Sequence, residues 1–340
     1  MRDNLRIDDY SCVETNMKYR ILGKSGLRVS EIGVGAWQLG GPLVLDGKTD
    51  GHPDVGVDFS TDLIRRCGDE LGINFLDTAE QYGAGESERR VGLALAGQRD
   101  KWIVSTKFGM QVGDVQRLPD GTPSGKRVND VSAKQVPISL ENSLRRLRTD
   151  HVDVYLYHSP PDRAEAETVA RFLESAKRKG QIRAVGISTM KFELAEYLQS
   201  IGCLDVIQFP ENMIEPQPRF RALMSQHNIG GILRGAFAGG RLSGKYFHQP
   251  PQFSPQDIRG TRLRPEDFAK FAGLESLVNK NRSMPQAALR WLLDQPTTST
   301  IILGSKTFEE YRDATAATDL PALTSGEQSQ IDAMRVQLVG

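Results

Sequence analysis

The sequence is poor in the residues that build disulfide frameworks and metal centres. Its 340 residues include three cysteines and five histidines. Cys12, Cys67 and Cys203 are odd in number and widely separated, and the chain has no HExxH or CxxC motif. Such spacing gives neither a set of paired disulfides nor a zinc site. We therefore expect no bound metal, and we expect reduced thiols in a cytoplasmic protein.

Long apolar runs and an excess of one charge are also lacking. No apolar run approaches the roughly 20 residues that cross a membrane, and the opening MRDNLRIDDY lacks the apolar centre of a signal peptide. Lys and Arg together number 43, as do Asp and Glu, so the formal net charge is zero. This balance argues against nucleic acid or a membrane as a partner. Residues 1–16 are polar and aperiodic, which predicts an N-terminal extension.

The remaining residues, 17–340, alternate between two kinds of segment. A hairpin is predicted over 18–30, and each of the eight short apolar segments that follow precedes a segment with helical periodicity. The predicted strands are residues 31–35, 73–77, 101–107, 152–158, 184–188, 205–209, 231–235 and 299–304. Most are continuously apolar, as expected of parallel strands that are covered on both faces.

Loop lengths favour a closed barrel over an open sheet. The long, Gly- and Pro-rich connections all follow strands, at residues 41–58, 110–134 and 236–267, whereas connections from helix to strand are short. Elaboration at one face is typical of the active-site end of a TIM barrel. We therefore predict an α/β fold. It is a single (β/α)8 TIM barrel domain over 17–340, with an N-terminal β-hairpin and long loops at the carboxyl-terminal face.

Capping residues predict where individual helices begin and end. Ser60 or Thr61 is expected to cap the first helix, and Gly72 is expected to stop it. Ser87 is expected to mark the start of the second helix. The segment FAKFAGLESLVNK is expected to be helical.

Four chemically active side chains follow consecutive predicted strands. Asp77, Lys107 and His158 each end a strand, and Tyr82 lies in the loop after Asp77. A free phenol has a pKa of about 10, and a nearby ammonium group favours the phenolate. A carboxylate would hold that ammonium in place, and an imidazole could orient a substrate carbonyl. Together the four residues predict a site that polarises a carbonyl oxygen.

Each of these residues has an ordinary structural interpretation when it is taken alone. A lysine at a strand end is usually a solvated charge, a histidine there is more often a satisfied rim residue, and an aspartate often belongs to a turn. Gln208 lies within an apolar strand, where its amide needs hydrogen-bond partners. Because the carboxyl ends of all barrel strands share one face, a joint catalytic function explains the set better.

These residues lie in segments that resemble the aldo-keto reductases. The resemblance runs from about residue 17 to about residue 317, through GKSGLRVSEIGVGAW, GINFLDTAEQYGAGESERRVGLAL, WIVSTKFG, SLRRLRTDHVDVYLYH, GQIRAVGIS, VIQF, GRLSGKY and LGSKTFEE. It implies reduction of a carbonyl compound, or oxidation of an alcohol, by hydride exchange with a nicotinamide cofactor. Asp77, Tyr82, Lys107 and His158 match the catalytic tetrad, with Tyr82 as the general acid or base.

The resemblance also implies a set of cofactor-binding residues. Ser188 and Gln208 match residues that hold the carboxamide, whereas Thr189 replaces a family Asn. Arg234 stands where many members stack an aromatic ring on the nicotinamide, and a guanidinium plane can stack as well. The full set is Ala36, Trp37, Ser188, Thr189, Gln208, Arg234, Gly235, Phe237, Gly304, Ser305, Lys306, Glu310 and Asp313. Gly235 and Phe237 begin the Gly-rich segment expected along the pyrophosphate.

The residues after the last strand give conflicting indications about the cofactor. Lys306 can pair with a 2'-phosphate, but Glu310 stands where many members carry Arg or Gln. A carboxylate repels a phosphate and can accept hydrogen bonds from a free ribose diol. The sequence favours NADP(H) slightly and leaves NAD(H) open. Trp37 and the long connection over 110–134 are candidates for the substrate pocket, although Trp37 could equally cap the core. The charges of Arg234 and Glu211 at the mouth suit a polar substrate, such as a sugar or a hydroxylated aldehyde.

Two other functions remain open at this point. Lys107 on a barrel strand could form a Schiff base as in a lyase, although a nearby Asp77 would keep its amine protonated. The resemblance also allows a cofactor-binding subunit that regulates another protein without turnover. The sequence predicts neither the oligomeric state nor the direction of the reaction.

Overall fold

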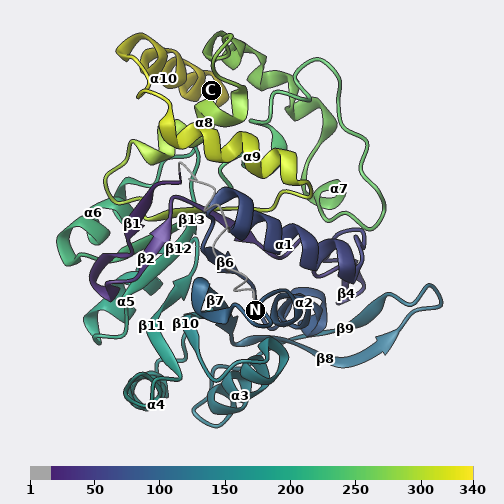
Figure 1. Ribbon diagram of the computed structural model, residues 1–340, viewed down its shortest axis with the longest axis vertical. Helices are drawn as coiled ribbons and strands as arrows, with labels where there is room; N and C mark the ends of the chain where they lie inside the picture. Colours follow the sequence, from purple (N-terminus) through teal and green to yellow (C-terminus); the bar gives the residue numbers. More distant parts are fainter. Residues whose placement is uncertain (1–16, 340) are drawn as a thin grey trace, which may run out of the picture.

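A closed barrel of eight parallel strands forms the centre of the computed structural model, which describes residues 17–339. The predicted extension over 1–16 lies outside the described residues. Around the barrel the strands are β3 (Ile32–Gly35), β6 (Phe75–Asp77), β7 (Ile103–Phe108), β10 (Val152–Tyr157), β11 (Ile182–Ser188), β12 (Val206–Pro210), β13 (Gly230–Arg234) and β14 (Thr300–Leu303). Helices surround these strands (Figure 1). The predicted (β/α)8 barrel is confirmed.

The N-terminal hairpin fills the amino-terminal end of the barrel. Strands β1 (Tyr19–Ile21) and β2 (Arg28–Ser30) pair antiparallel. Leu22, Leu27 and Val29 of this hairpin are buried in one apolar cluster with inward side chains of the barrel, such as Phe75 and Leu156. Burying a Leu or Val side chain stabilises a fold by about 1.5–3 kcal/mol. The hairpin therefore closes this end and leaves the carboxyl-terminal end as the accessible face.

A second, larger apolar core lies between the barrel and its outer helices. The repeating helices are α1 (Val57–Leu71), α2 (Glu86–Ala94), α3 (Gln135–Leu147), α4 (Ala166–Arg178), α5 (Phe192–Ser200), α6 (Pro218–His227), α8 (Met284–Leu293) and α9 (Phe308–Ala316). Each presents apolar residues at helical spacing to the sheet, as Val169, Leu173 and Ala176 of α4 do. The added helices are α7 (Arg259–Arg262) and α10 (Ser325–Val339), and the sequence predicted neither of them.

Helix ends were predicted less well than helix positions. Gly72 does end α1, in the left-handed conformation with φ 69°, but that helix begins at Val57 after Gly56 rather than at Ser60 or Thr61. Ser87 lies inside the first turn of α2, where its hydroxyl donates to the Ala36 carbonyl at 2.7 Å. The predicted cap of α1 was therefore wrong, whereas the predicted start of α2 at Ser87 falls one residue after its observed start at Glu86. The segment predicted as a helix near residue 270 is the 3-10 helix η6 (Ala269–Leu277).

The long connections at the carboxyl-terminal face contain strands that the sequence did not predict. Strands β8 (Met110–Arg117) and β9 (Pro123–Asn129) form a hairpin that projects from the body of the molecule (Figure 1). Strands β4 (Val44–Leu45) and β5 (Lys48–Thr49), from the connection after β3, extend it to a four-stranded sheet in the order β5, β4, β9, β8. The site therefore has folded walls rather than open loops.

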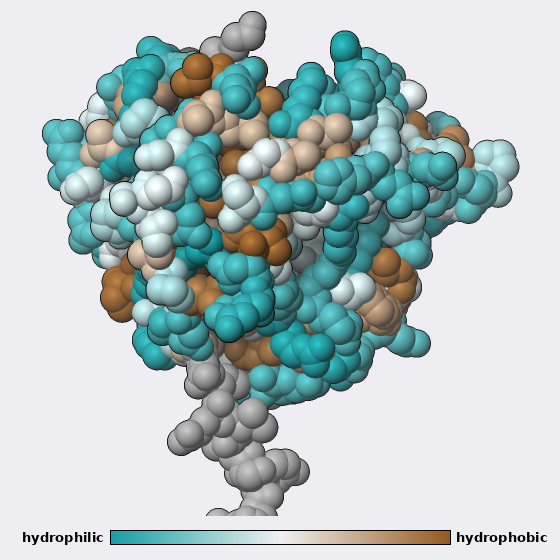
Figure 2. All heavy atoms as spheres, turned by 90° about the horizontal axis from the view of Figure 1, so that it is seen from above, coloured by the Kyte–Doolittle hydropathy of each residue, from teal (hydrophilic) through white to brown (hydrophobic). Residues whose placement is uncertain are grey.

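The face of the molecule drawn in Figure 2 is predominantly hydrophilic. In Figure 2 apolar side chains occur in small separate groups among polar ones. Within residues 17–339, no helix combines the length and the apolar character that spanning a membrane requires.

Candidate active site

The four predicted catalytic residues come together at the carboxyl ends of adjacent strands. Asp77 ends β6 and Lys107 lies near the end of β7, while His158 directly follows β10. Tyr82 begins the short 3-10 helix η2 (Tyr82–Gly85) after β6. Because β6, β7 and β10 are neighbours in the barrel, the three strand ends share one edge.

Lys107 is the centre of the hydrogen-bond network. Its side chain is fully buried, and its Nζ donates to Asp77 Oδ2 at 2.6 Å, the Thr78 carbonyl at 2.8 Å and the Tyr82 hydroxyl at 3.1 Å. These three acceptors match the three donors of an ammonium group. Burial by itself would lower the pKa of Lys107, but the negative charge of Asp77 raises it above the ordinary value. The lysine is therefore a fixed cation in contact with the phenol.

A chain of amide and hydroxyl hydrogen bonds holds the carboxylate from the other side. Gln208 Nε2 donates to Asp77 Oδ1 at 2.8 Å, and Ser188 Oγ donates to Gln208 Oε1 at 2.7 Å. Gln208 is completely buried in β12. Its predicted need for hydrogen-bond partners is thus met by a link between Ser188 and the Asp77–Lys107 pair. Both oxygens of Asp77 are engaged, which fixes the direction of the lysine.

His158 lies across the site as a neutral imidazole. Its ring meets the ring of Tyr82 edge-on, with 5.7 Å between centroids. Burial lowers the pKa of His158 well below its ordinary value, and the positive charges of Lys107, Arg234 and Arg127 lower it further. Its Nδ1 is buried and has no hydrogen-bond partner among residues 17–339. A neutral imidazole here can orient a carbonyl oxygen without supplying a charge.

Tight backbone packing positions Tyr82. The next residue, Gly83, has φ 60°, and a Cβ atom there would lie 2.0 Å from the carbonyl oxygen of Gly40. Only glycine fits this close approach between the loops after β6 and β3. Trp37, from the loop after β3, stacks on the Tyr82 ring at 5.8 Å between centroids. The half-buried phenol is therefore held between Trp37 and Lys107, and its hydroxyl faces the strand ends.

The predicted cofactor residues follow five other strand ends of the same face. Ala36 and Trp37 follow β3. Ser188 ends β11 and Thr189 follows it, while Gln208 lies in β12. The remaining members are Arg234, Gly235 and Phe237 at the end of β13, and Gly304, Ser305 and Lys306 after β14. The guanidinium of Arg234 makes no hydrogen bond or ion pair with other described residues, although it is half-buried.

Glu310 and Asp313 of α9 have other partners. Glu310 accepts a hydrogen bond from Lys245 Nζ at 2.7 Å and one from the backbone N–H of Lys306 at 3.3 Å. Asp313 accepts hydrogen bonds from Ser283 and Gln286 at the start of α8, at 3.0 and 2.9 Å. That carboxylate therefore joins two helices, and we do not keep Asp313 in the cofactor site.

Two residues beside the site were not picked out from the sequence. Asp50 is buried and accepts a hydrogen bond from Gln81, the neighbour of Tyr82. His52 is buried with its ring edge-on to Trp37, 5.0 Å between centroids, and its Nδ1 lies 3.5 Å from Asp257. Both lie in the polar stretch after β3, and a buried Asp and His within a Gly- and Pro-rich loop carry no sequence signal of their own.

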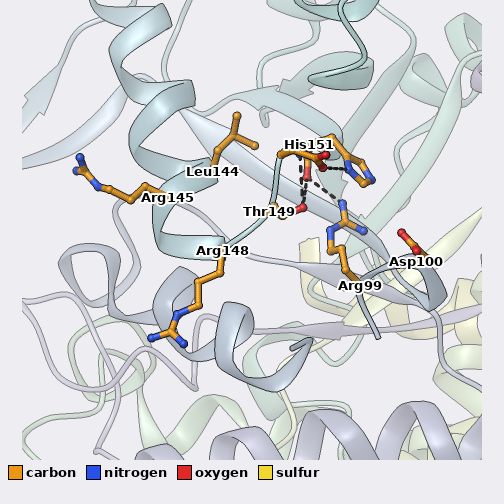
Figure 3. Close-up of a pocket in the computed structure, with 8 residues that line it drawn as sticks. Arg99, Asp100, Leu144, Arg145, Arg148, Thr149 and His151 are labelled. Carbon is orange, nitrogen blue, oxygen red and sulfur yellow. Dashed lines mark hydrogen bonds and ion pairs between the residues drawn. The ribbon is translucent and has the colours of Figure 1, made fainter. Parts of the chain in front are cut away.

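A surface pocket lies at the opposite end of the barrel. Its lining includes Arg99, Arg148 and His151, which precede β7 and β10 rather than follow them. Figure 3 shows Arg148 and Arg145 pointing away from each other and Arg99 turned toward His151. Arg99 is already used, because it donates to Asp153 at 2.8 Å and to two backbone carbonyls. The cations around this pocket do not point toward one another, and the pocket is separate from the site around Lys107 and Tyr82.

Known proteins resemble this chain over nearly its whole length. The model of the aldo/keto reductase family matches residues 31–336. An aldo-keto reductase of Bacillus subtilis strain 168 is 28% identical over 302 residues, which cover 85% of each chain. The L-glyceraldehyde 3-phosphate reductase of Escherichia coli K12 is 28% identical over 93% of this chain and 92% of its own.

Solved structures agree with the sequence comparisons. The holo form of an aldo-keto reductase from Bacillus halodurans superposes with a TM-score of 0.74 and 26% identity, covering 94% of this chain and 96% of that one. The chain belongs to the aldo/keto reductase family, as its motifs predicted. It is therefore an oxidoreductase by class.

Proposed function

We propose that this protein reduces an aldehyde or ketone, or oxidises the corresponding alcohol, with NADP(H) or NAD(H). The observation that carries the proposal is the contact of the Tyr82 hydroxyl with Lys107, which is itself held by Asp77. Tyr82 gives its proton to the carbonyl oxygen in reduction and recovers it in oxidation. We further propose that the protein works in the cytoplasm, where NAD(P)H is available.

Each other residue of the tetrad has its own function in this proposal. Lys107 stabilises the negative charge that develops on the phenol, and Asp77 holds that ammonium in place. His158 donates a hydrogen bond to the carbonyl oxygen, for which its neutral form is sufficient. A nicotinamide cofactor, when bound, supplies the hydride. The four side chains thus transfer the proton and polarise the carbonyl group of the substrate.

The residues along the face fit a nicotinamide dinucleotide. Arg234 is half-buried and has no protein partner within the described part of the chain, so its planar cation is free to stack on a ring. Gly235 is exposed with φ 72°, and Gly239 and Gly240 follow with φ 73° and 105°. Such a glycine-rich backbone allows close approach of a pyrophosphate. Lys306 makes no ion pair with a described residue.

Cofactor preference gives a direct test of the site after β14. The position of Glu310 supports NADP(H), because its carboxylate pairs with Lys245 and leaves the ammonium group of Lys306 available. We expect NADPH to bind more tightly than NADH when their binding is followed by fluorescence titration. Lys306→Met should weaken NADPH binding by about 10- to 100-fold, the loss of one charge-assisted contact, and should leave NADH binding nearly unchanged.

A matched control for that titration is Lys280→Met, since Lys280 is an exposed lysine away from the strand ends. Tighter binding of NADH, with no effect of Lys306→Met on NADPH, would reverse the cofactor assignment. Failure of both nucleotides to bind would contradict the proposed function itself.

The substrate is proposed to be polar, such as a sugar or a hydroxylated aldehyde. The relative from Escherichia coli is named for a phosphorylated hydroxyaldehyde. Trp37 supplies one apolar wall beside Tyr82, while Arg234 brings charge to the mouth of the site. Glu211, which we expected at the mouth, is buried and paired with Arg221, and it does not form part of the proposal.

A Schiff-base lyase is a weaker alternative. The amine of such an enzyme must lose its proton to attack a carbonyl carbon, whereas Lys107 is fully buried and its pKa is raised by Asp77. Borohydride treatment with a keto compound is expected to trap no adduct. A non-catalytic regulatory subunit would instead bind the cofactor tightly, turn over no carbonyl compound and co-purify with a partner.

A further inference from the structure

Three segments from distant parts of the chain meet at one buried carboxylate beside Tyr82. Asp50, in the connection after β3, is 6% exposed. Its Oδ2 lies 3.7 Å from an amino nitrogen of Arg127 in β9, and its Oδ1 lies 3.5 Å from an amino nitrogen of Arg262 in α7. The same carboxylate accepts a hydrogen bond from Gln81. Asp50 therefore lies between two guanidinium groups, one from β9 and one from α7, next to the loop that carries Tyr82.

Two hydrogen bonds to backbone carbonyls support the same arrangement. The Ile258 N–H donates to the Gly51 carbonyl at 3.1 Å, and Thr49 Oγ1 donates to the Pro255 carbonyl at 3.1 Å. β4 pairs with β9 of the projecting hairpin. The connection after β3 thus lies between the hairpin and the α7 segment, and all three lie along one side of the molecule (Figure 1).

The two arginines retain donors for another anion. Their contacts with Asp50 are longer than the roughly 2.7–2.9 Å of a charge-assisted hydrogen bond, and a guanidinium carries five N–H donors. Their side chains are 34% and 58% exposed. By contrast, Arg259 in the same segment is committed to Asp257 at 2.7 Å. Of these two arginines, only Arg127 has a second carboxylate nearby within the described part of the chain, that of Asp46 at 3.9 Å.

Both guanidinium groups border the reacting centre. The Arg262 guanidinium lies 5.7 Å from the ring centroid of Trp37, which stacks on Tyr82. Arg127 lies beside Asp50, which accepts a hydrogen bond from Gln81, the residue before Tyr82. Burial and the charge of Arg262 both lower the pKa of Arg234. The Asp77–Lys107 pair is neutral as a unit. Three arginines, Arg127, Arg234 and Arg262, therefore lie near Tyr82 and His158, and Asp50 and Asp46 offset only part of their charge.

We infer that Arg127 and Arg262 select a carbonyl substrate that carries an anionic group, a carboxylate or a phosphate, and that Asp50 is the positioning residue that orients both. The anion would bind at the mouth while the carbonyl oxygen lies between Tyr82 and His158. This inference rests on the proposed function, since it names the class of substrate for the same site. Arginine suits the task because its planar fork matches carboxylate and phosphate oxygens.

The test compares neutral and anionic carbonyl compounds of similar size. NADPH oxidation is followed with glyceraldehyde against glyceraldehyde 3-phosphate, and with butanal against succinic semialdehyde. We expect the wild-type kcat/KM to be at least about 10-fold higher for the anionic member of one or both pairs. The pair that shows the preference tells whether phosphate or carboxylate is the recognised group.

Variants assign the preference to the two arginines. Arg127→Gln and Arg262→Gln are each expected to lower kcat/KM for the anionic compound about 10-fold, chiefly by raising KM. For the neutral compound, each variant should change kcat/KM by less than about threefold. Asp50→Asn should also lower the ratio of kcat/KM for the anionic compound to kcat/KM for the neutral compound. Lys126→Gln, at the exposed neighbour of Arg127, is the matched control and should retain the wild-type ratio.

Three results separate the possible failures. Equal wild-type kcat/KM for both members of each pair would overturn the inference and leave the proposed function standing. Arginine variants that lower kcat/KM equally for the anionic and the neutral compound would also overturn the inference. Such a result would show that the contacts of Arg127 and Arg262 with Asp50 only join the loops. Turnover of no carbonyl compound, anionic or neutral, would instead contradict the proposed function. Unchanged NADPH binding and thermal melting confirm that each variant is folded.

Discussion

Tyr82→Phe is expected to lower kcat for carbonyl reduction by about 10²–10⁴-fold, the usual contribution of a positioned general acid. The phenylalanine ring keeps the stacking on Trp37 and the edge-on contact with His158, and it loses only the hydroxyl that contacts Lys107. The loss should therefore appear in kcat, measured by NADPH oxidation at saturating substrate. The dissociation constant for NADPH should stay within about threefold of the wild-type value.

Tyr197→Phe is the matched control for this variant. Tyr197 lies in the outer helix α5, where its ring packs against the guanidinium of Arg163, and it is not part of the proposed site. Removing its hydroxyl should leave kcat unchanged. A Tyr82→Phe enzyme with more than about a tenth of the wild-type kcat would show that another group supplies the proton.

Lys107→Met is expected to abolish measurable turnover and to lower the free energy of unfolding by about 3–5 kcal/mol. Methionine fills a similar volume, but it leaves the Asp77 carboxylate buried and without its cation, and breaking a buried pair has a cost of this size. Denaturant unfolding at neutral pH measures the change. Because the pKa of Lys107 is raised in the folded state, its contribution to stability is present at neutral pH and is lost only at alkaline pH, above the ordinary lysine range.

A second variant separates stability from activity. Lys107→Met/Asp77→Asn removes the unpaired charge and keeps an oxygen that can accept the hydrogen bond from Gln208. The double variant should recover part of the lost stability and remain inactive. If it is as unstable as Lys107→Met alone, the cost comes from packing around the lysine stem rather than from the carboxylate.

The barrel and the tetrad were predictable because both follow from the order of short local patterns. Eight apolar segments with long connections on one side predict a closed barrel, and closure places Asp77, Lys107 and His158 at one edge. Gln208 could be noticed because an amide within an apolar strand needs a partner. What the sequence could not reveal was that this partner is Asp77, 131 positions away.

The loops that surround the site were harder to predict than the strand ends that carry its catalytic residues. The stretch over residues 110–134 is largely polar, and no apolar run marks β8 and β9, whose side chains are mostly exposed. The meeting of Asp50, Arg127 and Arg262 depends on contacts between three loops, and such contacts leave no periodic pattern. The start of α1 was missed because the hydroxyl of Ser60 donates to the Gly56 carbonyl and does not cap the helix.

The hydrogen-bond network around Lys107 carries the proposed carbonyl reduction, and transfer of a labelled hydride tests this function most directly. The enzyme is incubated with NADPH deuterated at the transferring position of the nicotinamide and with an aldehyde, and the alcohol product is analysed by mass spectrometry. We predict one deuterium on the former carbonyl carbon for each NADPH oxidised by the wild type, and no detectable product with Lys107→Met. Tight NADPH binding with no labelled alcohol from any aldehyde or ketone, anionic or neutral, would contradict the proposal.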